Sequence, residues 1–378
     1  MSRGVGPEDP RRSQGILYRD GVATSELDPA STVNPRPARP ARPVPGEQWE
    51  RGPSNALVDA AVDDLCTDES VAVTTAVVVV QHGRIIAERY QPDSSPNAFR
   101  EGSAPDTTSD TTLISWSMAK SLTHALVGFA VGDGLVKVDD PVRVPEWRGS
   151  EKESITWQHL LNMRSGLDFV EDYVDGGISH VIDMLFATGQ ADVAAYAAAR
   201  PLAHPPGSHW SYSSGDTNIV SRALASVTGQ SSSDQMHAYI KRRLFDPIGM
   251  ASATAKFDEA GTFIGSSFVY ATARDFARFG LLYLHDGWWG DRQLLPAGWV
   301  DHARQPTPVP DTEAHGYGAH WWLWPYDGAL ACHGYEGQRT IVLPDRDAVV
   351  VRLGKTNAAR NEQLRERLHD VIRAIPTG

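Results

Sequence analysis

The chain reads Ser117-Met118-Ala119-Lys120 where an extended, Thr/Ser-rich segment (107–115) changes to a helical pattern (119–131). Residues three apart share one face of a helix, so the Lys120 amine is placed beside the Ser117 hydroxyl. A serine hydroxyl is a weak nucleophile at neutral pH and needs a base within hydrogen-bond reach. Burial and the positive end of a helix dipole lower the pKa of a lysine, which lets its amine serve as that base. The tetrapeptide therefore predicts a nucleophile and its base at the start of a helix.

Composition places the chain among globular proteins. It has 378 residues, of which 41% are hydrophobic, enough for two domains or one large domain with an insertion. The formal net charge of -12 argues against nucleic acid or an anionic membrane as a partner. Cys66 and Cys332 are the two cysteines, too few for a disulfide scaffold. With no secretory signal and no apolar run of membrane-spanning length in the sequence, we expect a cytoplasmic protein.

The secondary-structure signals are β-rich at both ends and helical in the middle. Residues 1–55 are rich in Pro, Arg and Gly and predict an extended arm. A hairpin is expected around Gln81-His82-Gly83. Strands are predicted at 71–80, 84–90, 338–343 and 348–353. Helices are predicted at 56–65, 119–131, 156–163, 192–199, 216–228, 233–244, 272–284 and 361–375.

This order predicts an α+β fold in which one sheet collects the strands of both ends. The first and last helices would cover the sheet, and the middle would form a mostly helical domain. We expect the arm over 1–55, the sheet domain over 56–120 and 266–378, and the helical domain over 121–265. Ser117 would then lie in the cleft between the two domains.

Several common functional motifs are missing from the sequence. It contains no nucleophile elbow, no H-E-x-x-H, no C-x-x-C and no dinucleotide-binding glycine pattern. Gly354-Lys355-Thr356 resembles the end of a phosphate loop, but Val349 stands where the first glycine belongs. The thirteen histidines lack ligand spacing, so we predict neither a metal nor an organic cofactor.

A second candidate element is the loop that contains Tyr212-Ser213-Ser214, before the helix expected from residue 216. A tyrosine hydroxyl can relay a proton if nearby cations stabilise its phenolate form, and Lys120 would be such a cation. A third element is Gly334-Tyr335-Glu336-Gly337-Gln338, which enters a predicted strand. A buried tyrosine that only holds its loop is the alternative for Tyr212.

Together the three elements resemble the serine β-lactamase-like superfamily, in the branch of class C β-lactamases, family VIII esterases and 6-aminohexanoate-dimer hydrolases. The phrases at 160–167, 171–175 and 272–275 fit as well, and the resemblance covers about residues 70–375. It implies a β-lactamase/transpeptidase-like fold with an antiparallel sheet flanked by helices.

The resemblance also implies a Ser-Lys-Tyr reaction centre. Ser117 would attack a carbonyl and form an acyl-enzyme, while Lys120 and Tyr212 share the proton. The backbone N–H groups of Ser117 and Tyr335 would hold the oxyanion. The expected substrate is a small ester or amide, and the oligomeric state is left open, a homodimer included.

Two departures from the family pattern bear on the substrate. The strand that carries Lys-Thr-Gly in β-lactamases reads Cys332-His333-Gly334 here, and Ser214 stands where an Asn is frequent. Both changes remove groups that recognise the carboxylate of a β-lactam. The sequence thus favours esters and linear amides over antibiotics.

On the substrate side, the resemblance implies roles for Tyr173, Trp322 and His333. Tyr173 would bond the scissile nitrogen, or else is a surface-loop residue. Trp322 would line the cleft, or else belongs to the core, and His333 is a further candidate for lining the cleft. Asp183 is a loosely aligned candidate for binding a substrate amine.

Three functions stay open at this point. The first is an ester- or amide-cleaving serine hydrolase. The second is a D-amino-acid peptidase or weak β-lactamase. The third is a catalytically silent binding protein of the same fold, which the joint presence of serine, lysine and tyrosine argues against.

Overall fold

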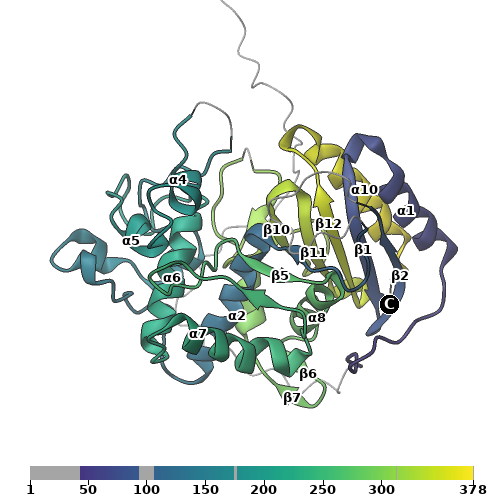
Figure 1. The fold of residues 1–378 in the computed structure, drawn as a ribbon, viewed down its shortest axis with the longest axis horizontal. Coiled ribbons are helices and arrows are strands. Elements are labelled where there is room, and N and C mark those ends of the chain that lie inside the picture. Colours follow the sequence, from purple (N-terminus) through teal and green to yellow (C-terminus); the bar gives the residue numbers. More distant parts are fainter. Residues whose placement is uncertain (1–42, 93–105, 174–176, 312, 378) are drawn as a thin grey trace, which may run out of the picture.

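The computed structural model describes residues 43–92, 106–173, 177–311 and 313–377. Its largest element is a seven-stranded antiparallel sheet, ordered β2-β1-β12-β11-β10-β9-β8 (Figure 1). The strands are β2 (Arg84–Tyr90), β1 (Val73–Gln81), β12 (Ala348–Lys355), β11 (Gln338–Leu343), β10 (Leu330–Gly334), β9 (Trp322–Leu323) and β8 (Gly316–Tyr317). The two ends of the chain thus meet in one sheet, which confirms the predicted α+β class.

The two faces of the sheet are covered by different helices. Alternate residues of β1 point to opposite faces, so Val77 and Val79 meet α1 (Ala56–Thr67) and α10 (Asn361–Ala374). On the other face, α8 (Ala273–Leu284) packs against β11 and β12 (Figure 1). Both faces of the central strands are therefore buried in apolar cores.

The remaining helices are mostly gathered beside β10, on the side of the sheet away from β1 and β2 (Figure 1). They are α2 (Ala119–Gly132), α3 (Trp157–Leu161), α4 (His180–Phe186), α5 (Val193–Ala198), α6 (Ser214–Val227), α7 (Ser233–Ile240) and α9 (Trp299–Arg304). The small strands are β3 (Leu113–Ile114), β4 (Thr254–Ala255) and β5 (Val269–Ala271), which form one sheet, and β6 (Trp288–Trp289) and β7 (Arg292–Gln293), which pair with each other. The domain boundaries expected at 120 and 265 stay a prediction.

Most predicted elements are present, with shifted ends. The hairpin turns at His82 and Gly83, both with positive φ. The run expected from residue 71 begins as a strand only at Val73, since a short turn occupies Glu69–Val71. The helix expected to reach 244 ends at Ile240 and continues as a π-turn.

The described part of the arm lies on the sheet domain. Gly52 N–H donates to the Ile85 carbonyl, and Ile85 N–H donates to that of Glu50. The Arg278 guanidinium donates to the carbonyls of Pro45 and Gly46. Residues 43–55 are thus an extended segment fixed by backbone bonds, while residues 1–42 of the predicted arm lie outside the described residues.

Candidate active site

Ser117 stands in the turn that joins the short strand β3 to helix α2. The turn is a 3-10 segment, Trp116–Met118, and α2 follows it directly. Trp116 adopts a φ of 46°, in the left-handed region that non-glycine residues seldom occupy. Such backbone strain gathers at functional sites. Here the strained residue directly precedes Ser117, which lies two residues before the start of α2.

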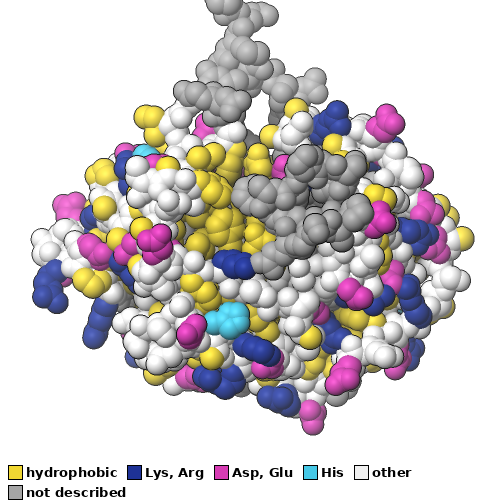
Figure 2. Space-filling model, in the orientation of Figure 1, with side chains coloured by type: hydrophobic (Ala, Val, Ile, Leu, Met, Phe, Trp, Pro, Cys, Tyr) yellow, Lys and Arg dark blue, Asp and Glu magenta, His cyan; other side chains and the backbone are white. Residues whose placement is uncertain are grey.

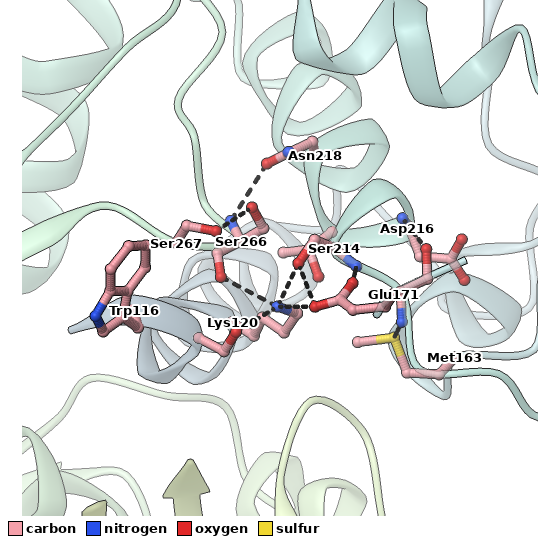
Figure 3. A network of polar contacts seen from close by, with 12 residues as sticks. Trp116, Lys120, Met163, Glu171, Ser214, Asp216, Asn218, Ser266 and Ser267 are labelled. Carbon is pink, nitrogen blue, oxygen red and sulfur yellow. Dashed lines mark hydrogen bonds and ion pairs between the residues drawn. The ribbon is translucent and has the colours of Figure 1, made fainter. Parts of the chain in front are cut away.

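The Lys120 amine is the centre of a polar network (Figure 3). It donates to the hydroxyl of Ser117 at 2.9 Å, to that of Ser214 at 2.9 Å and to the carbonyl of Ser266 at 3.1 Å. The one-turn spacing therefore places serine and lysine together as predicted. The Glu171 carboxylate stands 4.0 Å from the amine.

Burial and Glu171 act in opposite directions on Lys120. Lys120 is 1% exposed. Burial lowers the pKa of its amine to about 8, and the nearby Glu171 carboxylate opposes that shift. At pH 7 about a tenth of the molecules then hold a neutral amine, far more than for an ordinary lysine. A base of this strength suits proton abstraction near neutrality.

Tyr212 lies in the loop before α6, whose first turn is capped by the Ser213 hydroxyl. The Lys120 amine sits over the Tyr212 ring, 4.8 Å from its centre. The Ser117 hydroxyl lies near that of Tyr212 and lowers the pKa of the phenol. The structure thus brings together all three residues expected to react.

The expectation of a stabilised Tyr212 phenolate is wrong. Burial and the Glu171 charge raise the pKa of this phenol above its ordinary value, although the nearby Ser117 hydroxyl opposes the rise. The lysine amine meets the face of the ring, so its charge does not create an anionic oxygen. Tyr212 keeps its proton at rest and can act as a proton donor.

Glu171 and Ser214 belong to the site, although the sequence indicated no such role for either. Glu171 accepts hydrogen bonds from the Ser214 N–H (2.5 Å), the Ser214 hydroxyl (2.8 Å) and the Tyr173 hydroxyl (2.8 Å). It thereby links the lysine to Tyr173. The signal for Glu171 was its place two residues before Tyr173 in one acidic phrase. The sequence suggested that Ser214 marks a lost substrate contact. In the structure its hydroxyl accepts a hydrogen bond from the Lys120 amine.

The turn after β10 lies directly against the serine turn. A Cβ at Gly334 would stand 2.3 Å from the Ser115 carbonyl oxygen, so only glycine permits this approach. Tyr335 follows at once and begins the short turn Tyr335–Gly337. Its backbone therefore lies near that of Ser117, as an oxyanion pair requires.

Trp322 and His333 form one wall with Tyr212. The Trp322 ring lies 5.5 Å from that of Tyr212 and stacks on His333 at 5.1 Å. The Trp324 indole N–H donates to His333 Nε2 at 2.8 Å. Burial holds the pKa of His333 well below its ordinary value, so this imidazole is neutral. Trp322 is partly exposed and packs against two buried clusters, so its contact with the core is confirmed and its place in the cleft stays a prediction.

A separate chain of aromatic rings runs through Trp116, the residue before Ser117. Neighbouring ring centres are 4.8 to 6.0 Å apart along Tyr173, Tyr335, Trp116, Phe268 and Phe186. Tyr173, Tyr335 and Phe186 are more than 40% exposed. Figure 2 shows hydrophobic side chains gathered between α4 and β10, where this aromatic chain lies. Ser117 thus directly follows a member of this aromatic chain, Trp116.

The Asp183 side chain, on α4, is hydrogen-bonded to a residue just after that helix. Its carboxylate accepts bonds from the N–H and hydroxyl of Thr188.

Over 43–92, 106–173, 177–311 and 313–377, no cluster of His, Cys, Asp and Glu is arranged to hold a metal ion. Nor does any helix in those ranges have the length and apolar character to cross a membrane.

Comparison with known proteins gives consistent results. The sequence model of the beta-lactamase family matches residues 56–374. The 6-aminohexanoate-dimer hydrolase of Paenarthrobacter ureafaciens is 28% identical over 351 residues, which are 87% of this chain and 82% of that protein.

Solved structures agree on the fold. A candidate 6-aminohexanoate-dimer hydrolase from Bacillus anthracis superposes with a TM-score of 0.70 at 21% identity, covering 89% of this chain and 90% of that one. A family VIII carboxylesterase superposes with a TM-score of 0.63 at 14% identity, covering 86% and 99%. These structures share the β-lactamase/transpeptidase-like architecture.

Proposed function

The chain belongs to the beta-lactamase family, and from this membership we propose that it cleaves carboxylic esters or linear amides at a Ser117-Lys120-Tyr212 centre. The observation that carries the proposal is the buried Lys120 amine, 2.9 Å from the Ser117 hydroxyl. The hydrolase names of the similar proteins support the reaction class.

In the first step, neutral Lys120 accepts the Ser117 proton while the serine oxygen attacks the substrate carbonyl carbon. The carbonyl oxygen becomes an oxyanion, held by the N–H groups of Ser117 and Tyr335. Donors of this kind, fixed before reaction, each contribute about 3 kcal/mol to lowering the barrier. The tight approach of Gly334 to Ser115 supports this pair of donors.

Collapse of the intermediate breaks the bond to the leaving group. Tyr212, protonated at rest, donates its proton to the leaving nitrogen or oxygen and receives the Lys120 proton in return. The products of this half-reaction are the free amine or alcohol and the Ser117 ester. Water then attacks the ester and gives its proton to the Lys120–Tyr212 pair. The same pair returns a proton to Ser117, and the acid is released.

The leaving group has a second candidate contact. Tyr173 is fixed by its bond to Glu171 and lies at the end of the aromatic chain that begins at Tyr335. From there its hydroxyl is proposed to accept or donate a bond at the scissile nitrogen. Trp322 and His333 are proposed to shape the facing wall of the substrate site.

A D-amino-acid peptidase or weak β-lactamase is the second candidate. It is favoured by the shared family and opposed by Cys332-His333-Gly334, in which Cys332 stands where β-lactamases carry the lysine that binds the β-lactam carboxylate. A silent binding protein is the third candidate, opposed by the intact network around Lys120.

The test is a panel of p-nitrophenyl esters, linear amides and nitrocefin, run with wild-type protein and Ser117→Ala. We expect turnover of esters or amides, little turnover of nitrocefin, and none of the activity in Ser117→Ala. Nitrocefin as the best substrate would favour the β-lactamase alternative. A protein that turns over nothing would be the silent binder.

A further inference from the structure

The turn that follows β10, Tyr335–Gly337, has a strained backbone. Glu336 adopts a φ of 57°, in the left-handed region that side chains other than glycine seldom occupy. Gly337 follows with a φ of 81°. A strained conformation of this kind persists only where the surrounding structure fixes it. The turn therefore needs partners that hold its backbone.

Side chains of the two neighbouring strands hold all three carbonyl groups of this turn. Arg352 Nη1, from β12, donates to the carbonyls of Glu336 (3.2 Å) and Gly337 (3.1 Å). The Gln338 amide, at the start of β11, donates to the carbonyl of Tyr335 at 2.9 Å. Arg352 thus fixes the strained residue and the one after it.

The rest of the Arg352 guanidinium is anchored in the sheet. Nη2 donates to the Val73 carbonyl and to the Thr356 hydroxyl, both at 2.8 Å. Nε and Nη2 both donate to the Thr74 hydroxyl, at 3.2 and 3.1 Å. Val73 and Thr74 belong to β1, and β12 and β11 lie between β1 and β10. One side chain therefore ties the turn after β10 to a distant strand of the same sheet.

Two glycines make room for this guanidinium. A Cβ at Gly337 would stand 2.7 Å from Arg352 Nη1, and one at Gly354 would stand 2.8 Å from its Cζ and Nη2. Both distances are shorter than packed atoms tolerate. The guanidinium thus lies directly against the backbone of the turn and of its own strand, with little freedom to shift.

Arg352 is a buried cation without an ion pair. It is wholly buried, and among the residues that the structure describes no carboxylate lies within ion-pairing distance of it. Burial lowers the pKa of its guanidinium to about 9, so the group is still charged at pH 7. Burying an unpaired charge is costly, and apolar side chains could fill the same space. Only arginine, however, offers donors in several fixed directions at once.

The turn that Arg352 holds lies against the turn that contains the nucleophile. Gly334 meets the Ser115 carbonyl, and the Tyr335 ring contacts the Trp116 ring at 5.6 Å between centres. Ser117 follows Trp116 directly. An oxyanion donor acts only within a narrow range of distances from the reacting oxygen. A small shift of the turn would therefore weaken the Tyr335 N–H as a donor.

We propose that Arg352 is a positioning residue, which holds the Tyr335–Gly337 turn so that the Tyr335 N–H stays directed at the oxyanion. The inference rests on the proposed function for the reaction and adds a residue that touches no substrate. Arg352 acts through the backbone, by way of the carbonyls of Glu336 and Gly337.

A purely stabilising role is the competing account of Arg352. Its bonds to Val73 and Thr356 join separate segments, and losing them would lower the stability of the fold. Lower stability reduces the amount of active enzyme and slows every substrate by the same factor. A displaced N–H instead slows most the substrate whose transition state needs that hydrogen bond.

A substrate pair that differs only at the carbonyl atom separates these accounts. The best ester or amide of the substrate panel would be compared with its thiono analogue, in which sulfur replaces the carbonyl oxygen. Sulfur is a weak hydrogen-bond acceptor, so the analogue gains less from the N–H groups of Ser117 and Tyr335. The ratio of kcat/KM for the oxygen and sulfur substrates does not depend on how much of the enzyme is folded.

Arg352→Gln should lower kcat/KM for the oxygen substrate about 10- to 100-fold and reduce the ratio about 10-fold, because a displaced donor loses most of its effect. Arg352→Lys should give intermediate values. Arg278→Gln is the matched control, since Arg278 is also buried and donates to backbone carbonyls, those of Pro45 and Gly46. It should lower the unfolding temperature and leave the ratio unchanged.

Thr356→Val is a milder variant, which keeps the guanidinium and removes one of its acceptors. It should reduce the ratio about 2- to 3-fold, as the loss of one hydrogen bond does. This variant provides the comparison if thermal unfolding shows that Arg352→Gln does not fold.

A ratio that stays at the wild-type value in the folded variants of Arg352 and Thr356 would overturn the inference and leave the hydrolase proposal intact. An equal fall in Arg278→Gln would also overturn it, because the effect would then follow stability alone. A wild-type protein that cleaves nothing in the panel would refute the proposed function, and this inference with it.

Discussion

Two polar networks begin one helical turn apart on α2 and differ in kind. Lys120 begins the network at the reaction centre, and His124 begins the other, since residues four apart share a face. Both side chains are almost wholly buried. His124 Nδ1 pairs with the Tyr283 hydroxyl at 2.7 Å, and Nε2 pairs with His302 at 3.1 Å. His302 in turn reaches Gln158 at 2.8 Å.

The histidine network is neutral, and its members hydrogen-bond to one another. Burial lowers the pKa of His124 far below its ordinary value and that of His302 to about 4. Each neutral ring gives one proton and accepts one, so the four groups can form a single directed chain. Nothing in this arrangement requires a substrate.

The lysine network carries charge, and two of its members reach the surface. One carboxylate, Glu171, serves the Lys120 amine, two donors of Ser214 and the Tyr173 hydroxyl. Its members Tyr173 and Tyr212 are partly exposed, while Tyr283 is fully buried. Burial alone therefore does not mark the reaction centre. The reaction centre is marked by charged groups, Lys120 and Glu171, in a network whose members reach the surface.

The largest effect is expected from removing the base. Lys120→Ala should lower ester turnover by at least about 10³-fold, because serine loses its proton acceptor. Steady-state ester turnover of Lys120→Ala would be compared with that of the wild type and of Ser117→Ala. A rate close to that of the wild type would contradict the base assignment.

Tyr212→Phe should reduce turnover by about 10²-fold or more, since the leaving group loses its proton donor. The loss should be larger for amides, whose leaving nitrogen needs the proton, than for p-nitrophenyl esters, whose leaving phenolate does not. Equal losses for amides and p-nitrophenyl esters would indicate a packing role for this ring.

Glu171→Gln should shift the pH profile. Glu171 raises the pKa of Lys120, which burial lowers to about 8 overall, so its neutralisation should lower that pKa further. The acid limb of kcat/KM, where the amine becomes protonated, should then move to lower pH.

Asp216→Asn is the matched control for that shift. Burial raises the pKa of Asp216 to about 7, so it titrates in the same range and also lies near Glu171. If the limb moves in Asp216→Asn and stays in Glu171→Gln, the limb belongs to Asp216 and not to Lys120.

The histidine network should affect stability and not chemistry. The pKa of His302 is about 4 in the fold and near 6.5 in an unfolded chain, so the unfolded state binds more protons between these values. The free energy of unfolding should thus fall as pH drops from 6.5 to 4. His302→Gln should reduce that fall by about 2 kcal/mol in urea titrations at pH 7 and pH 5.

The exposed His209→Gln should leave the pH dependence of stability as it is in the wild type. Identical falls in His302→Gln and the wild type would show that the buried histidines do not contribute. In either case, ester turnover at pH 7 is expected to be close to that of the wild type in both variants.

The local parts of this molecule could be predicted from the sequence. Ser117 and Lys120 are one helical turn apart, the hairpin at His82-Gly83 carries its own turn signal, and α10 carries an apolar stripe. Each depends on neighbours within a few positions. The α+β class followed from the same signals and was confirmed.

The parts that failed depend on contacts between distant segments. Glu171 meets Ser214 across 43 residues, a pairing without any local pattern. The protonated Tyr212 follows from burial, which the sequence did not reveal. The pairing of Arg339 with His333 likewise depends on the register of two strands, which the sequence does not show.

The most direct test is to label the protein with a fluorophosphonate and map the adduct by mass spectrometry across a range of pH. We predict a single adduct on the Ser117 hydroxyl, formed faster as pH rises, with a midpoint near the Lys120 pKa of about 8 and with no labelling of Ser117→Ala. An adduct on another residue, or labelling that persists in Ser117→Ala, would contradict the account.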